Sequence, residues 1–256
     1  MTAPNRNVLW AETLVAELVA GGVEAVCLTP GSRSTPLTVA FADHPDVTTY
    51  SHLDERSSAF FALGRGRRTG RPTPVVTTSG TATANLHPAV MEASEGRVPL
   101  LLLTADRPPA LADSGANQTT DQHALYDGAV RWFRDLPEPE ADARKLRALR
   151  VTAARAMAET GGPEPGPVHL NVPFARPLEP TSVPGDVPDR QAVEDSVAFE
   201  GRDGPFVTTH RGDPHLDRSA VDAVLNAVAD AERGLLVCGP ADAPTPGRGP
   251  LADLAT

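Results

Sequence analysis

The sequence is poor in aromatic residues, lysine and cysteine, and it has no long hydrophobic run. Aromatic residues make up 4% of it, so its core must be built mainly from alanine, valine and leucine. No apolar stretch approaches the ~18–20 residues that a membrane-spanning helix needs. The N-terminal residues contain no hydrophobic signal core, so we expect a cytoplasmic protein with no membrane span.

Positive charge is scarce and comes almost entirely from arginine. Lys145 is the only lysine among 23 basic residues, and the formal net charge is -10. We do not expect nucleic acid as a partner, because phosphate binding requires a basic surface. The acidic charge does not argue against small anionic substrates, because binding them requires only a local group of arginines. Cys27 and Cys238 lie in separate apolar runs and are predicted to be buried, reduced thiols.

Short apolar runs alternate with segments of helical periodicity over most of the chain. The predicted strands are 23–28, 47–50, 75–78, 100–104, 130–133 and 167–172. Helices are predicted between them, including one over 81–95 with a possible kink at Pro88 and one over 142–159. This alternation predicts an α/β fold with a mainly parallel sheet flanked by helices. The loops that follow its strands should share one edge, where ligands bind.

The last third of the chain changes character. Proline, aspartate and glycine accumulate after residue 175, which is typical of a linker. A helical face over 221–228 and a strand-to-loop start at 234–240 follow. We therefore predict a first domain over 1–178, a linker over 179–215 and the beginning of a truncated second α/β domain over 216–256.

Glu55 lies where a β-prone run meets a helix. Asp54 is a predicted N-cap, with Ser57 three residues further on. Glu55 then falls in the first helical turn, where the helix dipole stabilises its anion. Taken alone, this pattern is more typical of an acid that only caps a helix.

Four polar clusters follow predicted strands and should meet at one edge of the sheet. They are Pro30–Ser34, Thr77–Ala82 with Asn85, Thr104–Pro109 and Ser114–Thr119. Each alone admits a plain interpretation, such as a common Gly-Ser turn or a solvated loop. Neither Ser32 nor Ser79 lies in the frame of a serine hydrolase, and no phosphate loop ending in Gly-Lys is present. The histidines are not at metal-ligand spacing and are predicted to be structural.

Five motifs together resemble the N-terminal, pyrimidine-binding domain of thiamine-diphosphate enzymes. They are Leu28–Pro36, Asp54–Phe60, Thr78–Pro88, Leu103–Pro109 and Gly115–Gln122. The order of these motifs and the residues in each most resemble those of the carboligases of menaquinone biosynthesis. These enzymes join 2-oxoglutarate to isochorismate with loss of carbon dioxide.

The resemblance implies a role for each matching residue. Glu55 looks like the catalytic acid that hydrogen-bonds the cofactor's aminopyrimidine ring, and a carboxyl group in a dehydrated pocket has a raised pKa. Arginine matches carboxylates with two parallel bonds, so two arginines look like clamps for isochorismate. The implied cofactor-binding residues are Glu55, Thr78, Ser79 and Gly80. The implied substrate-binding residues are Ser32, Arg33, Arg107, Asn117 and Gln118.

The resemblance also implies thiamine diphosphate and Mg²⁺ (or Mn²⁺) as cofactors. The family's Gly-Asp-Gly motif for the diphosphate and metal is missing here, so we predict no metal ligand in this chain and expect that domain beyond residue 256. We expect a homo-oligomer, a dimer or tetramer, with a composite active site, and a chain that does not turn over alone. Two alternatives stay open: another thiamine-diphosphate carboligase, resembling acetolactate synthase, or a non-catalytic α/β binding module.

Overall fold

The computed structural model describes residues 3–189, 195–210, 212, 215–235 and 237. The chain divides into two compact units, residues 1–208 and 209–256. The second unit contains the helix α8 (Arg218–Ala229), whose apolar residues are exposed among the described residues. The predicted strand start at 234–240 and Cys238 lie largely outside the described residues. None of the helices that the structure describes is long and apolar enough to cross a membrane.

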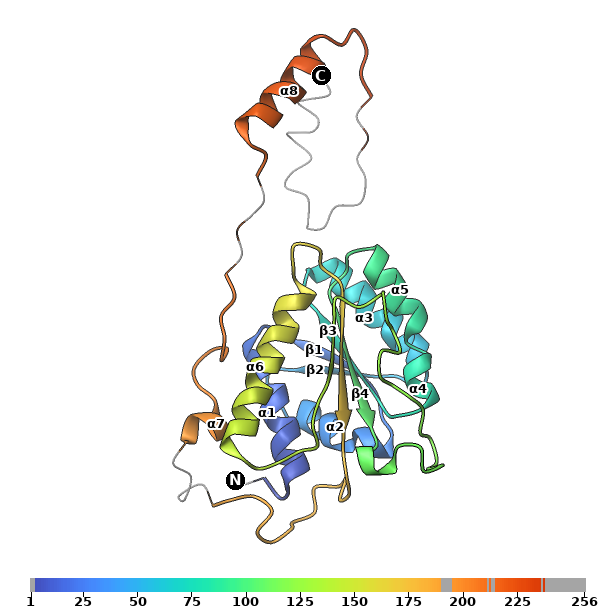
Figure 1. Ribbon diagram of the computed structural model, residues 1–256, viewed down its shortest axis with the longest axis vertical. Helices are drawn as coiled ribbons and strands as arrows, with labels where there is room; N and C mark the ends of the chain where they lie inside the picture. The colour runs from blue at the N-terminus through green and yellow to red at the C-terminus, as the bar shows by residue number, and fades with distance from the viewer. Residues whose placement is uncertain (1–2, 190–194, 211, 213–214, 236, 238–256) are drawn as a thin grey trace. The chain divides into compact units, whose positions relative to one another are not determined.

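A six-stranded sheet forms the centre of the first unit (Figure 1). Its strands are β1 (Ala25–Thr29), β2 (Thr48–Ser51), β3 (Thr73–Thr77), β4 (Leu100–Asp106), β5 (Trp132–Asp135) and β6 (Pro167–Pro173). They lie in the order β2-β1-β3-β4-β6-β5, and each neighbouring pair is parallel. The predicted α/β fold with a parallel sheet is therefore confirmed.

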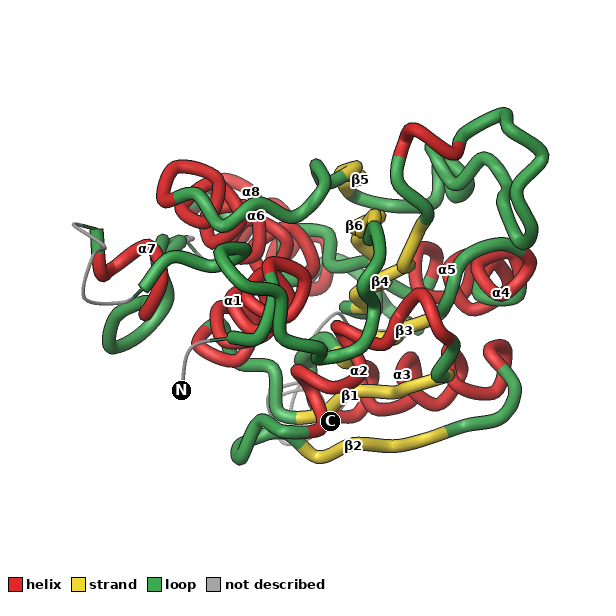
Figure 2. Tube along the Cα trace, turned by 90° about the horizontal axis from the view of Figure 1, so that it is seen from below, coloured by secondary structure: helices red, strands yellow, loops and turns green. Residues whose placement is uncertain are grey.

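Helices cover both faces of this sheet, with α1 and α6 on one side and α3 and α5 on the other (Figure 2). Their bounds are α1 (Arg6–Ala20), α2 (Thr35–Ala42), α3 (Glu55–Thr69), α4 (Thr81–Ala84), α5 (His87–Glu95) and α6 (Ala143–Thr160). Leu101 and Leu103 of β4 pack into the core with α1, α2 and α6. Leu100 and Leu102 alternate with them and pack against α3 and α5. Burial on both faces explains why the central strands are unbroken apolar runs.

Capping residues define the ends of the helices, and Asp54 is the N-cap of α3, as the sequence predicts. The Asp54 carboxylate accepts a 3.0 Å hydrogen bond from the Ser57 backbone N–H at the start of α3. Gly70 ends that helix in the left-handed conformation, with φ of 69°. Asp142 caps α6 in the same way as Asp54 caps α3. These caps fix Glu55 as the first residue of α3.

Two sequence predictions differ from the structure in their detail. The helix predicted over 81–95 is two helices, α4 and α5, separated at Asn85 and Leu86. Pro88 causes the break, because its nitrogen cannot donate the hydrogen bond that a continuous helix requires. Strand β5 begins at Trp132 instead of at residue 130, because the chain before it is still in a turn, with the Val130 N–H bonded to the Tyr126 carbonyl.

The stretch that follows β6 contains a short helix, α7 (Ser196–Glu200), which packs on α6. Arg150 of α6 donates hydrogen bonds of 3.0 Å to the carbonyls of Ala198 and Phe199. Its guanidinium also lies 3.3 Å from the carboxylate of Glu17 in α1, and both side chains are 3% exposed. The Glu17 carboxylate in turn accepts a hydrogen bond from the Phe206 N–H. A buried ion pair thus attaches residues 195–206 to α1 and α6 within the first unit. The predicted domain boundaries stay a prediction.

Candidate functional site

The loops after β1, β3 and β4 are in direct contact at the carboxyl edge of the sheet. A Cβ atom on Gly31 would lie 2.6 Å from Cβ of Thr78, so only glycine allows this approach. Gly80 adopts φ of 84°, and a Cβ atom there would lie 3.1 Å from the Gln118 carbonyl oxygen. Clusters that are far apart in the sequence therefore meet, as the parallel fold predicts.

The Ser79 hydroxyl joins two of these loops. Arg107 donates from Nη1 to Ser79 Oγ at 2.5 Å, and Ser79 donates to the Gln118 carbonyl at 3.1 Å. Ser79 is buried, so these contacts are made away from bulk water. A residue predicted to bind cofactor thus contacts two residues predicted to bind substrate.

Arg33 lies in the same positively charged region. Its Nη1 donates a 2.6 Å hydrogen bond to the Phe174 carbonyl at the end of β6. Burial lowers the pKa of Arg33, and the neighbouring charges of Arg107 and Arg176 lower it further, while Asp106 opposes the shift. A guanidinium stays charged in proteins, so these like charges repel one another. An anionic ligand would relieve that repulsion.

Glu55 lies beside the helix that opens at Gly80. The amide of Asn85, at the C-terminal end of α4, donates a 3.0 Å hydrogen bond to Oε2 of Glu55. Glu55 is partly exposed, so these residues alone do not form the dehydrated pocket that the resemblance implies. Its carboxylate is thus oriented by an uncharged hydrogen-bond partner.

Three predicted substrate residues, Ser32, Asn117 and Gln118, are exposed. Ser34, a residue that sequence reasoning missed, is instead buried in the first loop. It accepts from the Gly31 N–H at 3.1 Å and donates to the Gly31 carbonyl at 3.0 Å, which closes the turn around Arg33.

Sequence reasoning also missed a buried hydrogen-bond network behind the site. Gln122 accepts the Gly80 N–H at 2.9 Å through Oε1 and donates to Asn171 Oδ1 at 2.7 Å through Nε2. Asn171 donates 2.8 Å bonds to the carboxylates of Asp106 and Asp135. The sequence contained one signal for this network, because Asn171 is a polar residue inside an otherwise mainly apolar strand.

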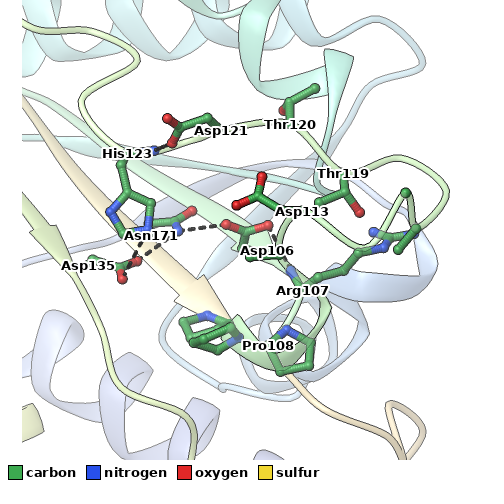
Figure 3. Close-up of a pocket in the computed structure, with 15 residues that line it drawn as sticks. Asp106, Arg107, Pro108, Asp113, Thr119, Thr120, Asp121, His123, Asp135 and Asn171 are labelled. Atoms are coloured by element: carbon green, nitrogen blue, oxygen red, sulfur yellow. Dashed lines mark hydrogen bonds and ion pairs between the residues drawn. The ribbon is translucent and has the colours of Figure 1, made fainter.

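A pocket of about 650 Å³ opens next to this network (Figure 3). Arg107 is the predicted site residue that lines it, together with the carboxylates of Asp106, Asp113, Asp121 and Asp135. Burial raises the pKa of Asp106, and its hydrogen bonds from Asn171 and the Arg107 N–H oppose that shift. Four acids make this pocket a poor match for a dicarboxylate. The arginine cluster beside Ser79 is the better anion site.

Comparison with known proteins agrees with the fold and the motifs. Residues 10–125 match the family described as thiamine pyrophosphate enzyme, N-terminal TPP binding domain. The 4-hydroxybenzoylformate decarboxylase of Rhodococcus jostii RHA1, described as thiamine-diphosphate-dependent, has a similar fold, with a TM-score of 0.67. That comparison covers 90% of this chain and 39% of the other at 19% identity, so it shows the fold alone.

Two similar curated relatives are named 2-succinyl-5-enolpyruvyl-6-hydroxy-3-cyclohexene-1-carboxylate synthase. The protein of Haloarcula marismortui is 68% identical over 246 residues, covering 94% of this chain and 42% of the relative. The protein of Halobacterium salinarum strain R1 is 63% identical over 244 residues, again covering 94% and 42%. The chain therefore spans less than half the length of these relatives. Residues 10–125 of its first unit are thus similar to the N-terminal TPP binding domain of thiamine pyrophosphate enzymes.

Proposed function

We propose that this chain supplies the pyrimidine-binding part of a thiamine-diphosphate-dependent carboligase. The whole enzyme decarboxylates 2-oxoglutarate and adds the resulting succinyl group to isochorismate, which gives 2-succinyl-5-enolpyruvyl-6-hydroxy-3-cyclohexene-1-carboxylate and CO2 for menaquinone biosynthesis. The observation that carries this proposal is the Ser79 hydroxyl, which contacts both Arg107 and the Gln118 carbonyl. This contact supports the proposal, because it joins one predicted cofactor residue to two predicted substrate residues.

The residues present fit the aminopyrimidine part of thiamine diphosphate. Glu55 offers a carboxylate that Asn85 already orients, and Asn85 is the C-cap of α4, the helix that follows Ser79 and Gly80. Thr78, Ser79 and Gly80 would line the ring, and Glu55 would hold a proton at its Oε1 or Oε2 atom against a ring nitrogen. When bound, thiamine diphosphate supplies the electron sink that decarboxylation of a 2-oxo acid requires.

The arginine cluster would bind the anionic substrate. Arg33 and Arg107 each use one N–H in the hydrogen bonds described above, and a guanidinium has five. The remaining donors suit the carboxylates of isochorismate, and the mutual repulsion of these cations favours an anion between them. Ser32, Asn117 and Gln118 would add neutral hydrogen bonds, since all three are exposed at this edge.

We propose the remaining parts of the assembly from the resemblance. Mg²⁺ or Mn²⁺ and the diphosphate would be bound by residues outside this chain. The active site would be completed by a second subunit of a homodimer or tetramer in the cytoplasm.

A chimaera tests the proposed function. This sequence replaces the matching 246-residue region of the Haloarcula marismortui synthase, and CO2 release from 2-oxoglutarate is measured with isochorismate present. We expect turnover that needs thiamine diphosphate and falls about 10²-fold or more with Glu55→Gln, since proton transfer by a positioned acid contributes about that much.

The same assay separates the alternatives. A chimaera that releases CO2 from pyruvate but not from 2-oxoglutarate would indicate an acetolactate-synthase-like enzyme. Full activity in the Glu55→Gln chimaera would contradict the role of Glu55. A chimaera that binds the cofactor but shows no turnover, while the unmodified Haloarcula marismortui synthase is active in the same assay, would favour a non-catalytic module.

A further inference from the structure

Gln122 is a buried amide in a loop that is otherwise largely exposed. Residues 110–121 are mostly exposed, whereas Gln122 has no exposed surface. This loop carries Asn117 and Gln118, two of the residues proposed to bind substrate. Its attachment to the sheet through Gln122 therefore bears directly on the site.

The orientation of this amide is fixed by the groups around it. The Gly80 N–H can only donate, so Gln122 must present Oε1 to it, at 2.9 Å. The Ala105 carbonyl can only accept, so Nε2 must face that oxygen, at 3.3 Å, and Oδ1 of Asn171, at 2.7 Å. Gln122 thus needs both a donor and an acceptor, which is the chemistry of an amide.

Asn171 gives this amide a rigid support. It is 1% exposed within β6, between β4 and β5 in the sheet. Its Oδ1 also accepts a 2.9 Å hydrogen bond from Thr104, and its Nδ2 is shared between Asp106 and Asp135. Sheet, amide and loop form a single connected unit.

We propose that Gln122, supported by Asn171, is a positioning residue for the site. It holds Gly80 at its positive φ of 84° and thereby fixes Ser79, which orients Arg107 and contacts the Gln118 backbone. Because Gln122 has no exposed surface, it would act through these neighbours and not by direct contact with a ligand. The importance of Gln122 for catalysis rests on the proposed function. Its role in attaching the loop to the sheet does not depend on that function.

The first test measures the loop in this chain itself, by amide hydrogen exchange of peptides covering 78–85 and 110–121. Gln122→Leu keeps the approximate volume and removes both polar contacts. We expect protection of these peptides to fall about tenfold, the effect of leaving one buried group unsatisfied. Asn5→Leu is the matched control, because Asn5 is another completely buried amide, bonded to the carbonyls of Glu179 and Thr181. It should leave the loop peptides protected.

A second variant, Gln122→Glu, makes the test independent of lost packing. Its protonated acid can accept from Gly80 and donate to Asn171, whereas its carboxylate would face two acceptor oxygens. Such a buried acid keeps its proton above its usual pH range. Protection should therefore match the wild type near about pH 6 and fall below it near about pH 8.5. Wild-type protein at each pH is the reference, because other titratable groups lie close to Asn171. Asp106 and Asp135 accept its hydrogen bonds, and Thr104 links it to His169.

Activity of the chimaera then tests the effect on the site. Both variants should raise the KM for isochorismate about tenfold, more than they lower kcat, with Gln122→Glu recovering at low pH. Unchanged protection in Gln122→Leu, or no difference between the two pH values in Gln122→Glu, would overturn the positioning role. An inactive wild-type chimaera would reject the proposed function alone, because the exchange result does not depend on turnover.

Discussion

The amide of Asn85 donates a 3.0 Å hydrogen bond to Oε2 of Glu55, so a residue at the end of one helix orients the carboxylate at the start of another. Asn85 is the C-cap of α4, and Glu55 is the first residue of α3. The break between α4 and α5 leaves Asn85 at a helix end, facing Glu55. A continuous helix over 81–95 would have placed it differently.

Asn85→Ala in the chimaera should lower kcat about tenfold, less than Glu55→Gln does. The carboxylate remains but loses one hydrogen bond that fixes its direction, and such bonds contribute about 1.5–3 kcal/mol when one partner is charged. The double variant should be no worse than Glu55→Gln alone, because both changes act through one group. Additive losses would show that Asn85 acts independently of Glu55.

Arg107→Ala should reduce kcat/KM for isochorismate by about 10- to 150-fold, which corresponds to a lost charge-assisted bond of about 1.5–3 kcal/mol. Arg33→Ala should act similarly, since both guanidiniums lie in one cluster. Arg134→Ala on β5 is the control, because its side chain is exposed on the same sheet. Steady-state kinetics at varied isochorismate measure the effect. A change confined to thiamine diphosphate affinity would contradict the proposed role of Arg33 and Arg107 in binding isochorismate.

Gly31→Ala should destabilise this chain by about 1–3 kcal/mol, because an extra methyl group in a filled space forces a backbone shift. The added Cβ would lie 2.6 Å from Cβ of Thr78. Gly64→Ala in α3 is the control, since nothing lies within 4 Å of its Cβ position. That control should stabilise the chain by about 0.5–1 kcal/mol. Urea denaturation midpoints of the two variants should therefore move in opposite directions.

His169 should make the protein less stable in acid. Burial lowers the pKa of His169 to about 3 from its usual 6.5, and the neighbouring charge of His123 adds to the shift. Between these values the unfolded chain binds a proton that the folded chain does not, so stability falls as pH falls through this window. The slope is about 1.4 kcal/mol per pH unit.

His169→Gln should remove that slope, because glutamine does not titrate. The difference in unfolding free energy between the variant and the wild type should grow in favour of the variant from about pH 6.5 downward. Chemical denaturation at several pH values measures it. A constant difference over that range would mean that His169 binds its proton equally well in the folded and the unfolded protein.

Much of the fold could be predicted because its signals are local. Apolar runs mark the strands, and Asp54 with Ser57 marks the start of α3, which also places Glu55. The order of the polar loops along a parallel sheet then brings Arg33, Ser79 and Arg107 to one edge.

What escaped prediction depends on contacts between distant residues. Gln122 and Asn171 are 49 positions apart, and neither has a local pattern that reveals the other. The bond from Arg33 to the Phe174 carbonyl spans 141 positions. Such pairings follow from strand order, which the sequence pattern alone did not provide.

The ion pair between Arg150 and Glu17 bears on how far this protein can be shortened. Residues 195–206 supply carbonyls to the arginine and an N–H to the glutamate. A chain that ended at 178 would keep the ion pair but lose these hydrogen-bond partners, and a hydrogen bond to a charged group contributes about 1.5–3 kcal/mol. The shortest stable chain should therefore extend through Phe206. Its end is set by the groups that hydrogen-bond the Arg150–Glu17 ion pair, and not by the last strand of the sheet.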